Sequence, residues 1–166
     1  MVSNVLSKYN NFAHSTTWPG DSLQIVDAQC NIEECRTTGA RRWARSNLTP
    51  VYRNALDSLV RRVSLKGRSA RVEDYVKAGA DGTTMNWNMT TEAVSAVRHG
   101  RRIILTSADG STLRMKVRCS SKFDMTFGPF VQNNDYENPA EGTSRLRLSY
   151  SVPAAAEGYI KVDMKP

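Results

Sequence analysis

The sequence predicts an α+β protein: an antiparallel β-sheet of about five to six strands, mainly within residues 84–164, with helices packed on its apolar face. The principal amphipathic helix is expected over about residues 50–64 and a short one over about 91–98. The sheet is predicted because apolar and polar residues alternate through most of the second half. The helix is predicted because a start signal at Thr49 precedes apolar residues at helical spacing. With 166 residues, the chain is expected to form a single domain, 1–166.

The N-terminal segment, residues 1–21, is polar and ends in a turn signal at residues 18–21, which predicts a loosely structured arm. Residues 22–30 are expected to form a short strand. Thr49 is expected to be the N-cap of the principal helix, with Pro50 as its first residue, where the missing N–H costs nothing. Gly67 can end the helix.

The segment after this helix holds weaker signals. A turn of helix is expected within residues 72–80. Residues 84–89 alternate cleanly and predict a half-buried strand, and Thr90 or Thr91 then caps the short helix that Gly100 ends.

The clearest tertiary signal is a hairpin. Residues 101–106 and 112–119 flank the pair Asp109-Gly110, which favours a tight turn between two strands. Alternation continues over residues 123–127, then 145–152 and 160–164, on either side of an acidic loop at 133–142. The residues expected to be buried in the core are Leu56, Leu59, Val63, Leu113, Met115, Val117, Leu146, Leu148, Ile160 and Val162.

The chain is basic and its positive charge is concentrated. Lys and Arg number 23 against 16 Asp and Glu, which gives a net charge of +7. Residues 36–71 carry ten of the basic residues and a single acid, Asp57, and residues 98–122 form a second basic block. Arginine outnumbers lysine, and its planar guanidinium suits phosphate oxygens. This charge distribution predicts a surface that binds polyanions, although any single arginine is expected to be merely solvated.

The predicted nucleic-acid-binding residues come from these blocks and from the cationic side of the predicted strands. They are Arg41, Arg42, Trp43, Arg45, Arg61, Arg62, Arg101, Arg102, Arg114, Lys116, Arg118, Arg145 and Arg147. Arg114, Lys116 and Arg118 are expected to share one sheet face with Arg145 and Arg147. The alternative is that these arginines only discourage edge-to-edge aggregation.

Aromatic residues that could stack on bases are scarce in this register. Phe123, Phe127 and Tyr150 are expected on the apolar side, which leaves Trp43 or a loop residue such as Tyr136. Burial of the Trp43 indole is the favoured alternative. The arrangement therefore favours sequence-tolerant contact with the nucleic-acid backbone.

No catalytic or metal-binding signature is present, so the sequence predicts a protein that is not an enzyme and has no cofactor or metal. The two histidines, His14 and His99, are expected on the surface or at a helix end. Cys30 and Cys35 form a single close pair, a weak signal for zinc, and are expected to be reduced thiols, with a disulfide as the alternative.

These observations predict a non-enzymatic, self-assembling protein that binds single-stranded nucleic acid, RNA above DNA, as a small viral or phage coat-type protein. It is similar in one respect to coat proteins of single-stranded RNA phages, a sheet whose polar face meets RNA, but the main helix here precedes the sheet and no motif matches. The alternatives are a phage head or tail component whose charges serve subunit contacts, and an intracellular nucleic-acid-binding regulator. A homo-oligomer is expected because the polar arm suits contact with a neighbouring subunit. The expected location is the virion or cytoplasm, without membrane insertion or a signal peptide.

Overall fold

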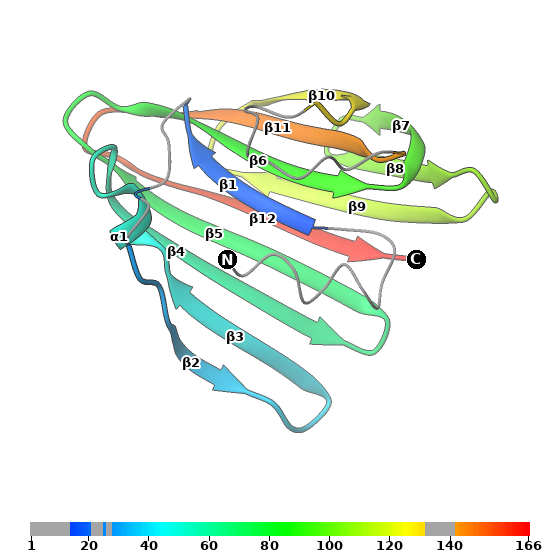
Figure 1. Ribbon diagram of the computed structural model, residues 1–166, viewed down its shortest axis with the longest axis horizontal. Helices are drawn as coiled ribbons and strands as arrows, with labels where there is room; N and C mark the ends of the chain where they lie inside the picture. Colours follow the sequence, from blue (N-terminus) through cyan, green and yellow to red (C-terminus); the bar gives the residue numbers. More distant parts are fainter. Residues whose placement is uncertain (1–13, 21–24, 26–27, 132–141) are drawn as a thin grey trace.

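The computed structural model is a sandwich of two β-sheets with a single turn of helix, so the α+β prediction is wrong (Figure 1). The structure describes residues 14–20, 25, 28–131 and 142–166. The larger sheet has eight strands in the order β2-β3-β4-β5-β12-β9-β8-β7, and the smaller has four in the order β1-β6-β11-β10. Neighbouring strands are antiparallel in both sheets.

The strands of the larger sheet are β2 (Ile32–Arg36), β3 (Arg41–Asn47), β4 (Leu56–Lys66), β5 (Ser69–Ala78), β12 (Glu157–Lys165), β9 (Thr112–Cys119), β8 (Arg102–Ser107) and β7 (Ala93–His99). The strands of the smaller sheet are β1 (His14–Pro19), β6 (Thr83–Thr91), β11 (Ser144–Val152) and β10 (Phe123–Pro129). The one helix, α1 (Thr49–Tyr52), lies between β3 and β4.

The predicted helix over residues 50–64 is replaced by α1 and most of β4. Thr49 does not cap a helix; Leu48 takes the N-cap position without a side-chain hydrogen bond, and the Thr49 hydroxyl accepts from the Leu59 N–H at 2.9 Å instead. The apolar spacing wrongly predicted a helix because Arg61 points inward between Leu59 and Val63. A charged residue at this inward position hides the two-residue period of apolar residues by which a strand is recognised.

The other local predictions divide between confirmed strands and wrong helices. The predicted helix over 91–98 is wrong, because this segment is the edge strand β7, and β5 replaces the turn of helix expected within 72–80. In the part of the 22–30 segment that is described, there is no strand. The hairpin around Gly110, whose φ is +84°, is confirmed as β8 and β9, and the strands predicted over 84–89, 123–127, 145–152 and 160–164 are confirmed as β6, β10, β11 and β12. The acidic loop at 133–142 lies almost wholly outside the described residues.

The predicted N-terminal arm contributes a strand to its own domain. Residues 14–19 form β1, which pairs along β6 at the edge of the smaller sheet. Residues 1–13 lie outside the described part of the chain.

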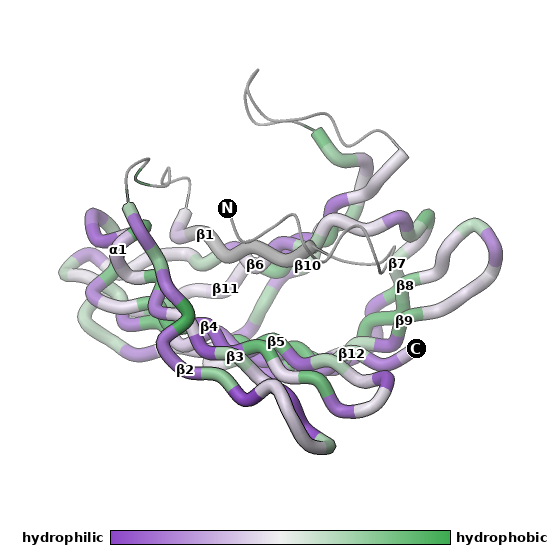
Figure 2. Tube along the Cα trace, turned by 60° about the horizontal axis from the view of Figure 1, so that its bottom comes forward, coloured by the Kyte–Doolittle hydropathy of each residue, from purple (hydrophilic) through white to green (hydrophobic). Residues whose placement is uncertain are grey.

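The core lies between the two sheets, which replaces the predicted helix-on-sheet packing (Figure 2). Eight of the ten predicted core residues are buried, while Val63 and Leu113 are partly buried and pack against the core. Trp87, Met85 and Met89 of β6 complete its centre, each with no exposed surface. The smaller sheet supplies the apolar cover that was expected from the helix.

Leu59→Ala should lower the free energy of unfolding by about 2–5 kcal/mol, because Leu59 has no exposed surface and its truncation leaves a cavity between the sheets. Chemical denaturation followed by circular dichroism measures this loss. A loss below about 1 kcal/mol would contradict the placement of β4 against the smaller sheet.

The two sheets differ in width, and this difference exposes a broad surface. β2 and β3 lie beyond the edge of the smaller sheet, and every residue of β2 is exposed (Figure 1). At the opposite edge the sheets approach, where the Arg98 guanidinium lies 4.1 Å from the Phe123 ring centroid. The outward surface of the larger sheet is therefore an eight-strand face that no other element of the described residues covers.

Candidate polyanion-binding surface

Outward side chains of the larger sheet line up in rows that cross the strands. Successive side chains of a strand point to opposite faces of the sheet. Leu59, Val72, Val162 and Val117 point into the core, so the residues directly before and after each of them point outward. Directly opposed outward residues on neighbouring strands form each row, and neighbouring strands lie about 4.8 Å apart. The rows can be read from the strand register.

Cations dominate the rows that lie nearest the β4–β5 turn. The end row contains Arg41, Lys66, Ser69, Lys165 and Arg114 on β3, β4, β5, β12 and β9. The middle row contains Trp43, Ser64, Arg71, Asp163, Lys116 and Arg102. The third row contains Arg45, Arg62, Glu73, Lys161 and Arg118. We call the surface formed by these three rows the basic face.

Five pairs of cations lie directly opposite each other on this face. They are Arg41 with Lys66, Arg45 with Arg62, Arg114 with Lys165, Arg118 with Lys161, and Arg102 with Lys116. Like charges in such positions destabilise a sheet. Where no acid balances the two charges, such a pair costs folding stability, so folding alone does not account for it.

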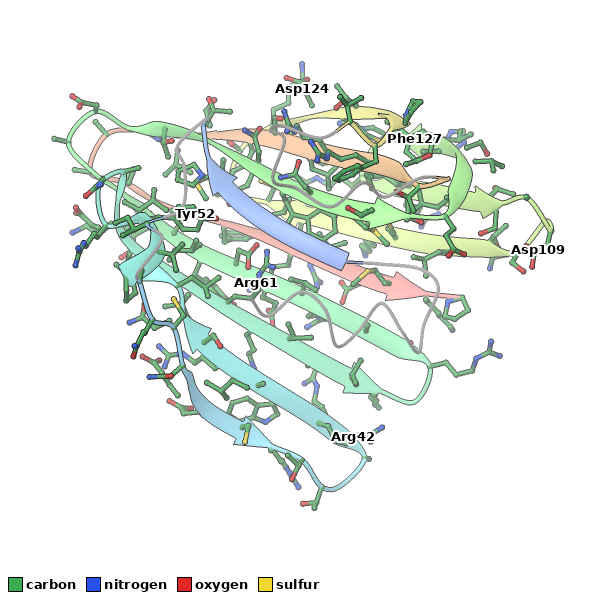
Figure 3. All side chains as sticks on the ribbon, viewed as in Figure 1. Arg42, Tyr52, Arg61, Asp109, Asp124 and Phe127 are labelled. Carbon is green, nitrogen blue, oxygen red and sulfur yellow. The ribbon has the colours of Figure 1, made fainter. Side chains whose placement is uncertain are left out.

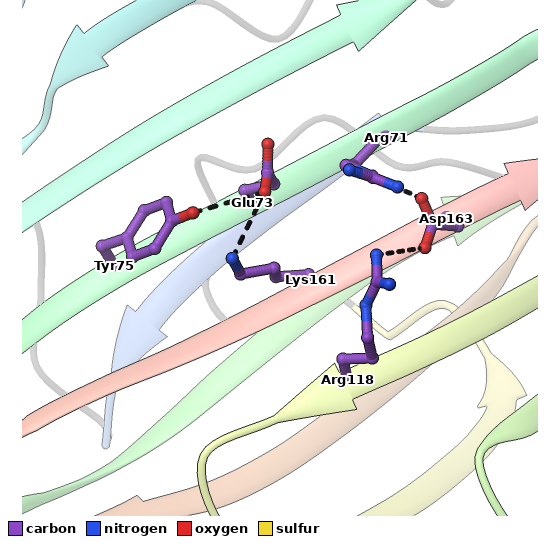
Figure 4. A network of polar contacts seen from close by, with 6 residues as sticks. All are labelled: Arg71, Glu73, Tyr75, Arg118, Lys161 and Asp163. Carbon is purple, nitrogen blue, oxygen red and sulfur yellow. Dashed lines mark hydrogen bonds and ion pairs between the residues drawn. The ribbon is translucent and has the colours of Figure 1, made fainter.

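Acids neutralise only part of the basic face (Figure 4). Asp163 bridges two arginines: its carboxylate accepts from Arg71 Nε and from Arg118 Nη2, the latter at 2.7 Å. Glu73 lies 3.6 Å from Lys161 Nζ. At the β2 edge, Arg45 Nη1 lies 2.6 Å from Glu33 Oε2 and 3.4 Å from Glu34 Oε1. Within the described residues, no ion pair involves the end-row cations or Lys116 and Arg102, so their charge faces solvent.

Arg71 and Lys161 stay protonated over the whole physiological pH range. The hydrogen bond to Asp163 raises the pKa of Arg71 above its already high value. The hydrogen bond with Tyr75, supported by the Glu73 carboxylate, likewise raises the pKa of Lys161. Binding of an anion here requires no prior protonation step.

Aromatic side chains also lie on the outward side, where the sequence analysis expected almost none. The Arg62 guanidinium carbon lies 4.4 Å from the Trp43 ring centroid, and the indole is half-buried beneath it. Beyond the third row, Tyr75 and Tyr159 are directly opposite each other on β5 and β12 and are 41% and 37% exposed. By contrast, Phe123 and Tyr150 point into the core as expected.

The structure places eight predicted site residues on the basic face. They are Arg41, Trp43, Arg45, Arg62, Arg102, Arg114, Lys116 and Arg118. Arg42 alternates to the inward side of β3, and Arg101 lies in the turn between β7 and β8.

Arg145 and Arg147 do not share a face with Arg114. They lie on β11 in the smaller sheet and point outward on the opposite side of the sandwich, because Leu146 and Leu148 between them point into the core. Arg147 Nε donates to Asn88 Oδ1 at 2.8 Å, and the Arg145 guanidinium lies over Phe130. The predicted five-cation surface is thus divided between the two sheets.

Arg61 does not belong to the basic face (Figure 3). It points into the sandwich, where its Nε and Nη2 donate to the two carboxylate oxygens of Asp74 at 2.7 and 2.8 Å. The Arg61 side chain is 14% exposed and that of Asp74 is fully buried. Burial opposes the charge on Arg61, but the Asp74 carboxylate outweighs it and raises the pKa of Arg61. This pair is part of the core.

Sequence reasoning missed several members of the basic face. Lys66, Arg71, Lys161 and Lys165 belong to it, as do the neighbouring Tyr75 and Tyr159. On β12, Lys161, Asp163 and Lys165 alternate with apolar residues, and this pattern correctly predicts that their side chains point outward. The pattern does not show which strands lie beside β12. For β4 and β5, the wrong helix assignment hid the signal.

No cluster of three or more metal-ligating side chains occurs among the described residues. All three cysteines are free thiols in the structure, with Cys35 exposed and Cys119 buried. No helix in the described ranges is long and apolar enough to cross a membrane.

The cysteines should differ in reactivity. Burial raises the pKa of the Cys119 thiol and limits access to it, whereas Cys35 is exposed on the edge strand β2. With a thiol reagent at pH 8, we expect fast labelling of Cys35 and labelling of Cys119 only after denaturation, as followed by mass spectrometry. Equally fast labelling of Cys119 in the native protein would contradict its placement in the core.

The fold and this surface define a two-sheet β-sandwich with a basic outer face. No protein-family model and no curated protein matches the sequence. Solved structures with a similar fold include a heparinase III, with 16% sequence identity and a TM-score of 0.64, and the heparan sulfate lyase HepC from Pedobacter heparinus, with 15% identity and a TM-score of 0.64. In each case the match covers 90% of this chain and 23% of the neighbour. These neighbours are enzymes, but at this identity the likeness concerns the fold alone.

Proposed function

We propose that this protein binds an extended polyanion, single-stranded RNA in particular, on the basic face. Three directly opposed cation pairs that no ion pair among the described residues balances carry the proposal, because they lie on one face of one sheet and cost folding stability. They are Arg41 with Lys66, Arg114 with Lys165, and Arg102 with Lys116. Phosphates laid across the rows would relieve that repulsion and release counterions. The proposed activity is binding, in keeping with the sequence-based expectation of a non-enzymatic protein.

Arrangement of the charges supports contact with a chain of anions over a small ligand. The end row alone places four cations across five strands, a span of about 19 Å at ordinary strand spacing. The surface is a sheet face and not a pocket, which suits a backbone that lies across the strands. Contacts of this kind are tolerant of sequence.

Fluorescence anisotropy with a labelled 20-nucleotide single-stranded RNA tests the proposal. We expect binding at low salt whose log–log dependence on salt concentration has a slope steeper than about −2, corresponding to three or more phosphate contacts. Absence of binding at 50 mM salt would contradict the proposal.

A sulfated polysaccharide is the second candidate, and one observation favours it: the fold neighbours include lyases named for heparan sulfate. Sulfate groups could contact the same cations. Titration of heparan sulfate oligosaccharides against the same protein separates the candidates. Tighter binding of the oligosaccharide than of RNA at equal salt would favour the second candidate.

Self-association and a coat-type role stay predictions. One argument for them is weaker than the sequence suggested, because residues 14–19 of the expected arm pair with β6 of the same chain. Size-exclusion chromatography with absorbance at 260 and 280 nm measures assembly and retained nucleic acid together. Assemblies that carry RNA support the coat-type role, assemblies without RNA support a head or tail component, and an RNA-binding monomer supports a regulator.

A further inference from the structure

We propose that Tyr75 and Tyr159 form a base-stacking subsite at the margin of the basic face. This inference rests on the proposed RNA binding and adds a specific contact to it. It would make the surface selective for nucleic acid over other polyanions. The two tyrosines are separated by 84 positions in the sequence and meet only through the pairing of β5 with β12.

The two rings lie in the middle of the sheet and have no structural role in the core. Their centroids are 6.5 Å apart with an interplanar angle of 42°, and both residues are more than a third exposed. β5 and β12 are central strands, so these aromatics do not protect an edge. Exposed aromatic rings beside a cationic surface are the usual platform for bases of single-stranded nucleic acid.

Neighbouring groups hold this platform in place before any ligand binds (Figure 4). The Tyr75 hydroxyl donates to Glu73 Oε1 at 3.3 Å, and Glu73 is 8% exposed. Lys161 Nζ lies 4.8 Å from the Tyr75 centroid and 5.1 Å from that of Tyr159. The Tyr159 backbone is fixed by hydrogen bonds to Ser120 at 3.0 and 3.1 Å. A preformed platform loses little conformational entropy on binding.

Charge separation on this surface favours a nucleic acid. The end and middle rows are strongly cationic, whereas the tyrosines lie beside Glu73, whose carboxylate balances Lys161. A nucleic-acid strand has the same division, with charged phosphates along its backbone and neutral bases projecting from it. A sulfated polysaccharide carries sulfate on the sugars themselves and would place anions against the Glu73 side.

The test compares two ligands of equal length, a 12-nucleotide oligouridine and an oligomer with the same charge whose sugars carry no bases. The variant Tyr75→Leu/Tyr159→Leu keeps apolar bulk and removes both rings, and Tyr75→Phe/Tyr159→Phe is the matched control that retains them. We expect the leucine variant to bind oligouridine at least about tenfold more weakly with an unchanged salt slope, since stacking does not release counterions. Its affinity for the base-free oligomer should not change, and the phenylalanine variant should resemble the wild type.

Thermal unfolding confirms that each variant is folded. Equal affinity of the wild-type protein for both ligands, or equal loss of both in the leucine variant, would overturn the stacking subsite while leaving phosphate binding in place. Failure of the wild type to bind either ligand at low salt would overturn both proposals.

Discussion

Asp74→Ala should lower the free energy of unfolding by about 3–5 kcal/mol, one of the largest effects expected of any single substitution in this chain. Asp74 is fully buried and accepts two hydrogen bonds from Arg61, so its removal leaves a guanidinium inside the sandwich without its carboxylate. Urea denaturation measures the loss.

The matched control removes both charges. Arg61→Met/Asp74→Leu fills the same space with apolar groups, and we expect a stability within about 1–2 kcal/mol of the wild type, since replacing a buried ion pair is often neutral. A double variant as unstable as Asp74→Ala would contradict the account, because the loss would then not come from an uncompensated charge.

Arg114→Glu/Lys165→Glu should weaken RNA binding by about 25-fold at 0.1 M salt and reduce the log–log salt slope by about 1.4, the effect of losing two phosphate contacts. The two residues are directly opposite each other in the end row and take part in no ion pair among the described residues. The double substitution exchanges one like-charged pair for another, so the free energy of unfolding should change little. Anisotropy titrations at several salt concentrations measure both the affinity and the salt slope.

Arg53→Glu/Lys122→Glu is the control for net charge. Both residues are exposed and lie outside the strands, in segments that are not part of the basic face. The control changes the total charge equally, so we expect a much smaller effect on affinity. Equal weakening by both variants would mean that net charge alone, and not this surface, attracts the RNA.

The strands that could be predicted from the sequence are those in which buried and outward residues alternate without a break. β9, β11 and β12 alternate without interruption between buried and outward residues, and eight of the ten expected core residues are buried. β4 and β7 were mistaken for helices for a physical reason. Each carries a β-bulge, between Leu56 and Ser58 and between Ala93 and Ser95, and a bulge breaks the two-residue period on which a strand is recognised.

The candidate site could be predicted only in part, because the residues that make up each row depend on which strands lie side by side. Arg114 and Lys116 were placed outward correctly, but the neighbouring strand is β12 and not β11. Lys165 and Asp163 therefore lie opposite them in place of Arg145 and Arg147. Alternation along one strand gives a side chain's direction but not the strand across from it. The same lack of long-range information hid the pairing of Tyr75 with Tyr159.

Lysine footprinting tests the central claim most directly, because the chain carries lysines both on the basic face and away from it. The free protein and its complex with single-stranded RNA are acetylated under identical conditions, and the modification of each lysine is measured by mass spectrometry. We predict that RNA protects Lys66, Lys116, Lys161 and Lys165, which lie on β4, β9 and β12, and leaves Lys122 in the β9–β10 turn as reactive as before. Unchanged reactivity of the four lysines in a sample where RNA is bound would contradict the assignment of RNA binding to this face.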